Sequence, residues 1–428
     1  MAPLLQREAS GREVVLGIFA NRLVATESRQ SVLVVGPSQS GKTTGVAIPA
    51  VLEWKGPVLA TSVKGDLLAE TLPVRTRLGQ VMVFDPTGSA GNLPHGVRAG
   101  WSPVAAAGTW EGARRVAAAL CSIGGRGGME DAGFWHASAE RLLAPMLRAA
   151  AVTGGGMADV VRWLDEESAG EILLALELAG ASLAVRAARA CFGLDDRQRS
   201  SVFSTAATIV AAYADPSIAA SEYVMPRITA DWLLGGGPLP RTLYCSAPAR
   251  DQERLSPVFV AMVREVLDAA FETSARTGAP LDPPLLVVLD EAANIAPLAD
   301  LDRILATAAG HGISLVTIWQ DLAQAEARFG GRWATVVNNH RAKLVCPGVS
   351  DPRTLELVSA LVGDAERQER TRTTSRDGAW SETEATGRTV IAPAGWIRRL
   401  PAGHGLLVYG TLPPALVRLR RVVASSGP

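Results

Sequence analysis

The segment SVLVVGPSQSGKTTGVAIPAVLEW, residues 31–54, combines three structural signals. Residues 31–35 form a short, β-branched apolar run that predicts a buried strand. The run from Gly41 to Trp54 predicts a helix, in which Pro49 should produce a kink. Between them, the residues from Gly36 to Thr43 fit G-x-x-x-x-G-K-[ST], in the strand-to-helix position that a phosphate-binding loop requires.

The residue types in this loop predict its chemistry. Backbone N–H groups and the positive end of the helix would hold the β-phosphate of a nucleotide, and Lys42 would bridge the β and γ oxygens. Thr43 would bind Mg²⁺, while glycine at 41 keeps a Cβ atom from blocking the loop. We therefore expect ATP and Mg²⁺ as ligands. The expected nucleotide-binding residues are Gly36, Pro37, Ser38, Gln39, Ser40, Gly41, Lys42, Thr43 and Thr44.

Further short apolar runs recur along the chain and alternate with helix-length segments. This alternation predicts an α/β fold with a mainly parallel sheet and helices on both faces. Together with the run at 31–35, the expected strands are residues 57–61, 80–84, 285–289, 313–319 and 342–346.

The segment between the first three and the last three expected strands differs from them in amino-acid composition and periodicity. Residues 108–234 contain Ala-rich amphipathic runs, such as FWHASAERLLAPMLRAA at 134–150, which predict an inserted all-α domain. The nucleotide-binding domain would then consist of residues 1–107 and 235–428. Towards the C-terminal end, the polar segment 366–388 predicts an exposed loop or an irregular hairpin. Two closing strands are expected around Pro413 and Pro414, at residues 405–410 and 415–422.

Length and composition exclude several classes of protein. The 428 residues suggest two or three domains, and 42 basic residues balance 42 acidic ones, which excludes a disordered tail or a polybasic binder. The four cysteines form no CxxC pair, which argues against a zinc site or a disulfide framework. No apolar run is long enough to span a membrane, and the first residues do not form a signal peptide. We therefore expect a cytoplasmic protein that reaches a membrane only through a partner.

An acidic pair and a glutamine complete the expected site. Asp290 and Glu291 follow the apolar run at 285–289, and ligands of open α/β sheets bind at such carboxyl ends of strands. Asp290 would hold Mg²⁺, and Glu291 would orient or deprotonate the attacking water. Gln320 ends the next strand and would sense the γ-phosphate through its amide. The expected catalytic residues are therefore Glu291, Gln320 and Lys42, and the expected metal ligands are Thr43 and Asp290.

A series of motifs in this order resembles the TraG/TraD family of type IV secretion coupling proteins, especially its actinobacterial members. Besides the phosphate loop, the likeness includes SVKGDL (62–67), VFDP (83–86), GFWHASAERLL (133–143), DRQRSSVFSTAATIV (196–210), TLYCSAP (242–248), VLDEAAN (288–294), TIWQDLAQ (317–324), NNHRAKL (338–344) and GLLVYG (405–410). The resemblance implies a RecA-like P-loop ATPase core with an inserted helical domain, related to the FtsK and HerA DNA pumps. It further implies a homohexamer that couples ATP hydrolysis to export of single-stranded or relaxase-bound DNA through a secretion channel.

Three features depart from the family pattern. Ser62 stands where members commonly carry an acidic residue, although Lys64 could still contact nucleotide or a neighbouring subunit. The stretch that often supplies an arginine finger reads Ala309-Gly310-His311-Gly312, which would leave a slow ATPase unless Arg29 or Arg303 substitutes. The usual amino-terminal membrane anchor is absent, so either an accessory membrane protein carries it or this is a soluble variant.

Alternatives to a secretion ATPase stay open at this point. One is a cytoplasmic DNA translocase or helicase, which the missing anchor favours, and another is a slow nucleotide-gated cargo receptor, which Ala309 favours. The C-terminal arginines fit either a channel that follows DNA phosphates or an ordinary exposed strand. They are Arg398, Arg399, Arg418, Arg420 and Arg421. The identity of the cargo and the direction of transport do not follow from the sequence.

Overall fold

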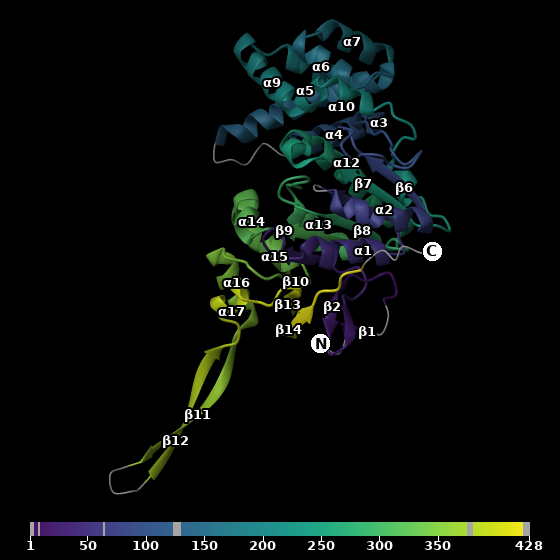
Figure 1. Cartoon of the computed structure of the whole chain (residues 1–428). Helices are drawn as coiled ribbons and strands as arrows, with labels where there is room; N and C mark the ends of the chain where they lie inside the picture. Colours follow the sequence, from purple (N-terminus) through teal and green to yellow (C-terminus); the bar gives the residue numbers. More distant parts are fainter. Residues whose placement is uncertain (1–3, 7–8, 63–64, 123–129, 375–379, 423–428) are drawn as a thin grey trace.

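A central sheet organises the computed structural model, which describes residues 4–6, 9–62, 65–122, 130–374 and 380–422 (Figure 1). All the expected strands are present, and they form one sheet with further strands that the sequence did not reveal. In spatial order the sheet contains β1 (Leu5–Gln6), β3 (Arg22–Ala25), β2 (Val15–Phe19), β14 (Leu412–Arg418), β13 (His404–Tyr409), β10 (Ala342–Val345), β4 (Val32–Val35), β9 (Ile313–Trp319), β8 (Leu285–Leu289), β5 (Val58–Ser62), β7 (Arg241–Ser246) and β6 (Gln80–Phe84).

The sheet has a parallel part and an antiparallel extension. Strands from β10 to β6 in this order are all parallel to their neighbours, whereas β13, β14, β2, β3 and β1 add antiparallel strands beside β10. The predicted mainly parallel core is therefore confirmed. The antiparallel extension joins the two ends of the chain, since β2 lies beside β14.

Side chains of the parallel strands alternate between two hydrophobic clusters. In β4, for example, Leu33 and Val35 belong to one cluster, while Val32 and Val34 belong to the other. Helices α1 (Ile48–Glu53) and α2 (Asp66–Leu78) cover the second face, and α12 (Gln252–Thr277) and α13 (Leu301–Ala308) cover the first. Because a strand turns successive side chains to opposite sides, uninterrupted apolar strands require helices on both faces, as expected.

The described residues between β6 and β7 contain helices and no sheet strand, and they lie beyond the sheet at the top of Figure 1. Helix α5 is the central one, and it packs against α4, α6, α7, α8 and α9. The division of the chain at residues 108 and 234 stays a prediction, because one hydrophobic cluster continues from the sheet into these helices. The helices are α3 (Pro103–Ala106), α4 (Trp110–Cys121), α5 (Glu130–Thr153), α6 (Met157–Asp165), α7 (Ala169–Leu178), α8 (Ser182–Phe192), α9 (Asp196–Val210), α10 (Pro216–Ser221) and α11 (Ala230–Leu234).

Two adjacent residues attach these helices to the sheet region. Trp101 Nε1 donates a 2.9 Å hydrogen bond to Glu265 of α12, and Ser102 Oγ donates a 2.7 Å bond to Glu222, which follows α10. Glu222 also accepts from the backbone N–H of Met157, and its burial raises the pKa of its carboxyl to about 7. Neighbouring residues thus bond to the two parts of the molecule: Trp101 to the core and Ser102 to the inserted helices.

The last part of the chain carries four more helices and a long arm. The helices are α14 (Leu322–Phe329), α15 (Trp333–Asn339), α16 (Pro352–Val362) and α17 (Ala394–Arg398). The arm consists of β11 (Asp364–Thr374) and β12 (Trp380–Val390) and extends from the end of the molecule opposite the inserted helices (Figure 1). No helix among the described residues is long and apolar enough to cross a bilayer.

The structure corrects three sequence-based expectations. The described parts of the polar segment 366–388 pair in a regular register, as β11 and β12, which places Glu366 opposite Arg388 and so pairs opposite charges. Pro413 and Pro414 lie inside β14, at a part of the strand that pairs only with β13. Pro49 sits in the first turn of α1 and follows a wide π-helical turn at 43–47, so the missing N–H is accommodated at the junction of two turns.

A buried arginine holds the end of α1, the helix behind the phosphate loop. Arg75 of α2 is only 1% exposed, and its guanidinium donates to the carbonyl oxygens of Val51, Trp54 and Gly56. Its Nε also donates a 2.7 Å bond to Thr242 Oγ1 in β7. The guanidinium therefore satisfies carbonyl groups that the end of the helix leaves without an intrahelical partner.

We expect Arg75→Met to lower the free energy of unfolding by about 2–5 kcal/mol, because the variant leaves these buried acceptors unsatisfied. Urea denaturation would measure the change. Arg77→Met is the matched control, since Arg77 lies exposed on the same helix and should shift stability by less than about 0.5 kcal/mol. Equal losses in both variants would contradict this role for Arg75.

Candidate nucleotide-binding site

Three adjacent parallel strands bring the expected site residues to one edge of the sheet. β9 lies between β4 and β8, with Val35 opposite Trp319 and Thr317 opposite Leu289. The residues that follow these strands are Gly36, Gln320 and Asp290, so the structure places all three at the same carboxyl edge. Segments separated by more than 200 residues in the chain thereby form one rim.

The phosphate loop turns sharply after β4. Gln39 and Gly41 both adopt left-handed backbone conformations, with φ of 65° and 90°. Glycine at 41 is therefore required by its backbone angle, rather than by crowding, since the nearest atom to an added Cβ would be Leu419 Cδ1 at 3.7 Å. Gly36 is the crowded glycine, because an added Cβ would lie 2.7 Å from the Cβ of Cys346.

Lys42 lies folded against its own loop. The side chain is 8% exposed, and its Nζ donates to the carbonyl oxygens of Gly36 and Pro37, the latter at 2.7 Å. These carbonyl oxygens hold the ammonium group beside the loop, where it can reach phosphate oxygens. The position agrees with the expected role of Lys42, although the role itself stays a prediction.

A hydrogen bond joins the loop to the acidic pair. Thr43 Oγ1 donates to Asp290 Oδ2 over 3.2 Å, and both oxygens are hard ligands of the kind that Mg²⁺ prefers. The carboxyl of Asp290 is 6% exposed, and its burial raises its pKa to about 6. The Thr43 hydroxyl opposes this rise, whereas the nearby carboxylates of Asp66 and Glu291 add to it. The residues thus fit a magnesium ion, which would supply the missing positive charge.

Glu291 and Gln320 lie beside this pair. Glu291 has a φ of 55°, a conformation that costs a residue with a Cβ about 1–3 kcal/mol and that often occurs at functional sites. Asn294 Nδ2 donates to Glu291 Oε2 at 3.4 Å. The backbone N–H of Gln320 donates to Gln324 Oε1 at 3.2 Å, which fixes the start of the segment after β9. Glu291 and Gln320 both remain partly exposed, so a ligand at the rim could reach them.

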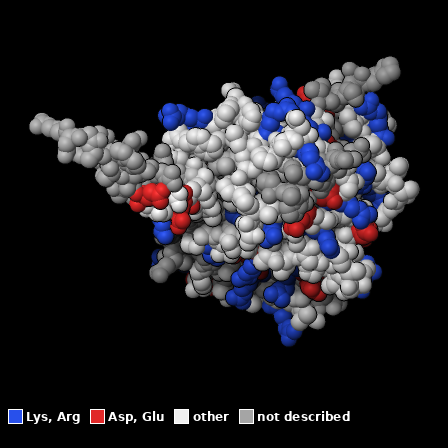
Figure 2. All heavy atoms as spheres, turned by 90° about the horizontal axis from the view of Figure 1, so that it is seen from below, with Lys and Arg blue, Asp and Glu red and all other residues white. Residues whose placement is uncertain are grey.

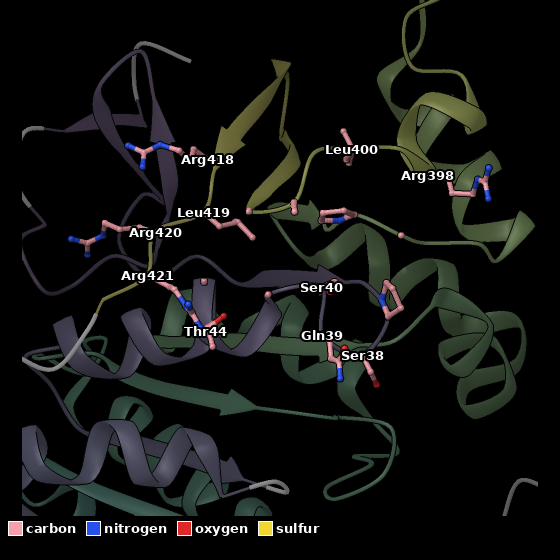
Figure 3. Close-up of a pocket in the computed structure, with 17 residues that line it drawn as sticks. Ser38, Gln39, Ser40, Thr44, Arg398, Leu400, Arg418, Leu419, Arg420 and Arg421 are labelled. Atoms are coloured by element: carbon pink, nitrogen blue, oxygen red, sulfur yellow. The ribbon is translucent and has the colours of Figure 1, made fainter.

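A hollow lies on the side of the loop that Thr44 and Gly45 face. It has a volume of about 870 Å³ and is bounded by Ser38 to Gly41, Thr44 and Gly45, and by two C-terminal segments. Figure 3 shows these segments, residues 398–403 and 418–421, facing the loop across the hollow. Sequence reasoning did not connect them with the nucleotide site, because they lie more than 350 residues away along the chain.

The five C-terminal arginines do not all line the hollow. Four of them line the hollow, Arg398, Arg418, Arg420 and Arg421, whereas the guanidinium of Arg399 donates to the carbonyl oxygen of Gly395. Figure 2, which views the molecule from below, shows separate groups of basic side chains with acidic ones between them. The described residues of this face therefore give no continuous basic track for DNA.

The residues that depart from the family pattern, and the two arginines that could substitute for a finger, do not lie together. Ala309 precedes β9 and Arg29 precedes β4, so both lie towards the amino ends of these strands, opposite the edge that carries the phosphate loop. Arg303 is exposed on α13. Ser62 ends β5 at the phosphate-loop edge, because the preceding Thr61 lies opposite Leu289, the residue before Asp290. Lys64 falls outside the described residues.

Comparison with known sequences gives a coherent set of relatives. "Conjugal transfer protein TraG" of Escherichia coli is 26% identical over 331 residues, which are 71% of this chain and 50% of the relative. "Protein VirD4" of Rhizobium rhizogenes is 44% identical over 69 residues, or 16% of this chain and 10% of that protein. The chain thus spans about half the length of the TraG proteins it matches.

Solved structures confirm the predicted RecA-like α/β fold. The bacterial conjugative coupling protein TrwBdeltaN70 in its unbound form has a TM-score of 0.75 at 18% identity, covering 99% of this chain and 92% of its own. TrwB in complex with a non-hydrolysable ATP analogue has a TM-score of 0.72 at 20% identity with the same coverage.

A family match extends over almost the whole sequence. The family described as "Type IV secretory system Conjugative DNA transfer" matches residues 8–420. The matched range contains the phosphate loop, the acidic pair, the inserted helices and the closing strands. The chain therefore belongs to the conjugative DNA transfer family of type IV secretory systems.

Proposed function

We propose that this protein is a Mg²⁺-dependent ATPase that acts as a coupling protein in conjugative DNA transfer. The observation that carries the proposal is the 3.2 Å hydrogen bond between Thr43 and Asp290, which joins the phosphate loop to the acidic pair. Phosphoryl transfer depends mainly on positioning and charge stabilisation, and these two elements supply both. Membership of the family and the fold shared with nucleotide-bound TrwB structures support the same function.

Each residue of the site has a distinct task in this proposal. The loop N–H groups and Lys42 bind the phosphate chain, and Thr43 and Asp290 hold Mg²⁺. The bound ion would neutralise charge on the β and γ oxygens. Glu291 orients or deprotonates the attacking water, and the amide of Gln320 contacts the γ-phosphate. Glu291 is suited to this role because its left-handed backbone turns the residue out of the strand direction at the rim.

The working unit is a homohexamer that moves single-stranded or relaxase-bound DNA towards a secretion channel. Residues 108–234 form its inserted helical domain, and a membrane or channel protein recruits the ring from the cytoplasm. Ala309 precedes β9 and lies away from the phosphate-loop edge of its own chain; in the proposed ring, this position would face a neighbouring subunit. Turnover should be slow, because alanine at this position provides no arginine finger.

ATP hydrolysis by the purified protein, with and without single- and double-stranded DNA, is the first test. We expect Mg²⁺-dependent hydrolysis that DNA stimulates and that Lys42→Ala abolishes. Glu291→Gln should retain ATP binding but lower the hydrolysis rate by about 10²-fold or more, because it removes water activation and leaves the phosphate cradle intact.

Equal hydrolysis rates for wild type and Glu291→Gln would contradict the role of Glu291. DNA-stimulated turnover without association with any secretion component would instead favour a cytoplasmic translocase. Tight ATP binding without turnover under any condition would favour a nucleotide-gated cargo receptor.

The stability of the metal-free protein tests Asp290. Its pKa of about 6 lies above the ordinary value of 3.8, so the folded state holds the proton more tightly than the unfolded state. The cost of ionisation is absent at low pH, grows as the pH rises from about 4 to 6, and is fully present above pH 6. Asp290→Asn should therefore raise the free energy of unfolding by about 1–3 kcal/mol at pH 8 and by less at pH 5.

Urea denaturation at both pH values measures this effect, and Asp282→Asn is a control because Asp282 is exposed. Added Mg²⁺ and ADP should stabilise the wild-type protein and fail to stabilise Asp290→Asn. Equal stabilisation of both proteins would show that Asp290 does not bind the metal.

A substitution at Ala309 tests whether this position faces a nucleotide across a subunit interface. Ala309→Arg should accelerate hydrolysis at least about tenfold in assembled rings and have no effect below the concentration at which rings form. Ala306→Arg, at an exposed position on α13, introduces the same charge nearby and should not accelerate hydrolysis. Hydrolysis rates would be measured on samples whose assembly state is determined by sedimentation analysis. An unchanged rate of Ala309→Arg in confirmed hexamers would mean that another residue acts as the arginine finger.

A further inference from the structure

The chain after β14 crosses the helical turn that follows the phosphate loop. We call residues Leu419, Arg420 and Arg421 the C-terminal strap. The backbone N–H of Leu419 donates a 2.7 Å bond to the carbonyl oxygen of Gly403, which anchors the strap to the segment before β13. This anchor keeps the strap beside the loop rather than free in solvent.

The strap packs closely on the loop and its helix. Leu419 lies against Gly41 and Gly45, and a Cβ added to Gly45 would be only 3.0 Å from the Cβ of Leu419. Arg420 forms an ion pair with Glu53 of α1. Two consecutive side chains thus fasten the strap to the loop helix, which leaves the position of the next residue well defined.

The strap forms one wall of the 870 Å³ hollow, and its arginines differ in direction. In Figure 3 the side chain of Arg421 extends towards the helical turn that carries Thr44, and both residues line the hollow. Arg418 and Arg420 extend away from the loop in the same view. Arg421 is exposed, so its guanidinium is accessible to a ligand in the hollow.

The position of Thr44 indicates which part of a nucleotide would enter the hollow. Thr43 contacts Asp290 on the side of the expected metal and γ-phosphate, whereas Thr44 lines the hollow on the other side. A phosphate chain that runs along the loop from Asp290 must therefore reach Thr44 with its α-phosphate and place the nucleoside beyond it. A cation on this wall of the hollow is placed to pair with the α-phosphate from the side opposite the loop.

Building on the proposed nucleotide site, we propose that Arg421 binds the α-phosphate of the nucleotide and that the C-terminal strap thereby closes the nucleoside side of the site. A guanidinium suits this task, because its planar array of N–H donors matches phosphate oxygens. The contact is the same for nucleoside diphosphates and triphosphates, since both carry an α-phosphate. It sets affinity for the nucleotide and takes no part in cleavage of the γ-phosphate.

The test compares Arg421→Gln with Arg418→Gln by isothermal titration with ADP and with a non-hydrolysable ATP analogue, each in the presence of Mg²⁺. Both variants lose one positive charge from the same hollow, but only Arg421 is directed at the loop. We expect Arg421→Gln to weaken both ligands equally, by about 10–100-fold, and Arg418→Gln to change affinity less than about twofold. Thermal unfolding of both variants would show that they fold as the wild type does.

Three results would overturn the proposal. They are ADP affinity in Arg421→Gln within twofold of the wild type, an equal loss in Arg418→Gln, and a loss for the ATP analogue without a loss for ADP. Unchanged nucleotide affinity of Arg421→Gln together with weaker affinity for DNA is a form of the first result, and it would indicate that Arg421 contacts DNA.

Lys42→Ala separates this inference from the proposed function. If Lys42→Ala abolishes nucleotide binding and Arg421→Gln does not weaken it, only the strap contact is refuted and the proposed ATPase still stands. Absence of nucleotide binding by the wild type would refute both.

Discussion

The parallel pairing of β4, β9 and β8 is the constraint on which the site depends. Its register sets the ends of these strands side by side, so the phosphate loop, Gln320 and the acidic pair leave the sheet at one edge. The backbone N–H of Gly36 extends the pairing by donating to the carbonyl oxygen of Trp319. A shift of one residue in any of these strands would turn its side chains to the opposite face, which would separate Thr43 from Asp290.

This arrangement brings groups together that destabilise one another in the absence of ligands. Asp290 is buried, and the carboxylates of Asp66 and Glu291 raise its pKa further. Internal contacts offset part of the cost: Lys42 donates to loop carbonyls and Thr43 donates to Asp290. A nucleotide with Mg²⁺ would exchange these internal partners for phosphate oxygens and a cation, so binding and stability are linked through the same atoms.

Short connections link distant parts of the molecule at two places. The C-terminal strap packs on Gly41 and Gly45, and Arg420 pairs with Glu53. At the other end, Trp101 bonds to Glu265 of the sheet region while Ser102 bonds to Glu222 of the inserted helices. These two adjacent attachments add a polar connection between the inserted helices and the core, beside the apolar packing of α4 on α12.

The amino-acid sequence alone determined the parallel strands other than β7, the phosphate loop and the acidic pair, because each is a local pattern of apolar and polar residues whose partners follow from general rules of α/β sheets. It also indicated the resemblance to coupling proteins. Only the tertiary structure decided that β1–β3 and β13–β14 form one extension, that β11 and β12 pair in a regular register, and that Arg421 lines the same hollow as Thr44. The extension and the hollow depend on pairing and packing between segments hundreds of residues apart, where local periodicity carries no information about the partner. The register of β11 and β12 depends on cross-strand pairs of polar residues, which apolar alternation does not reveal.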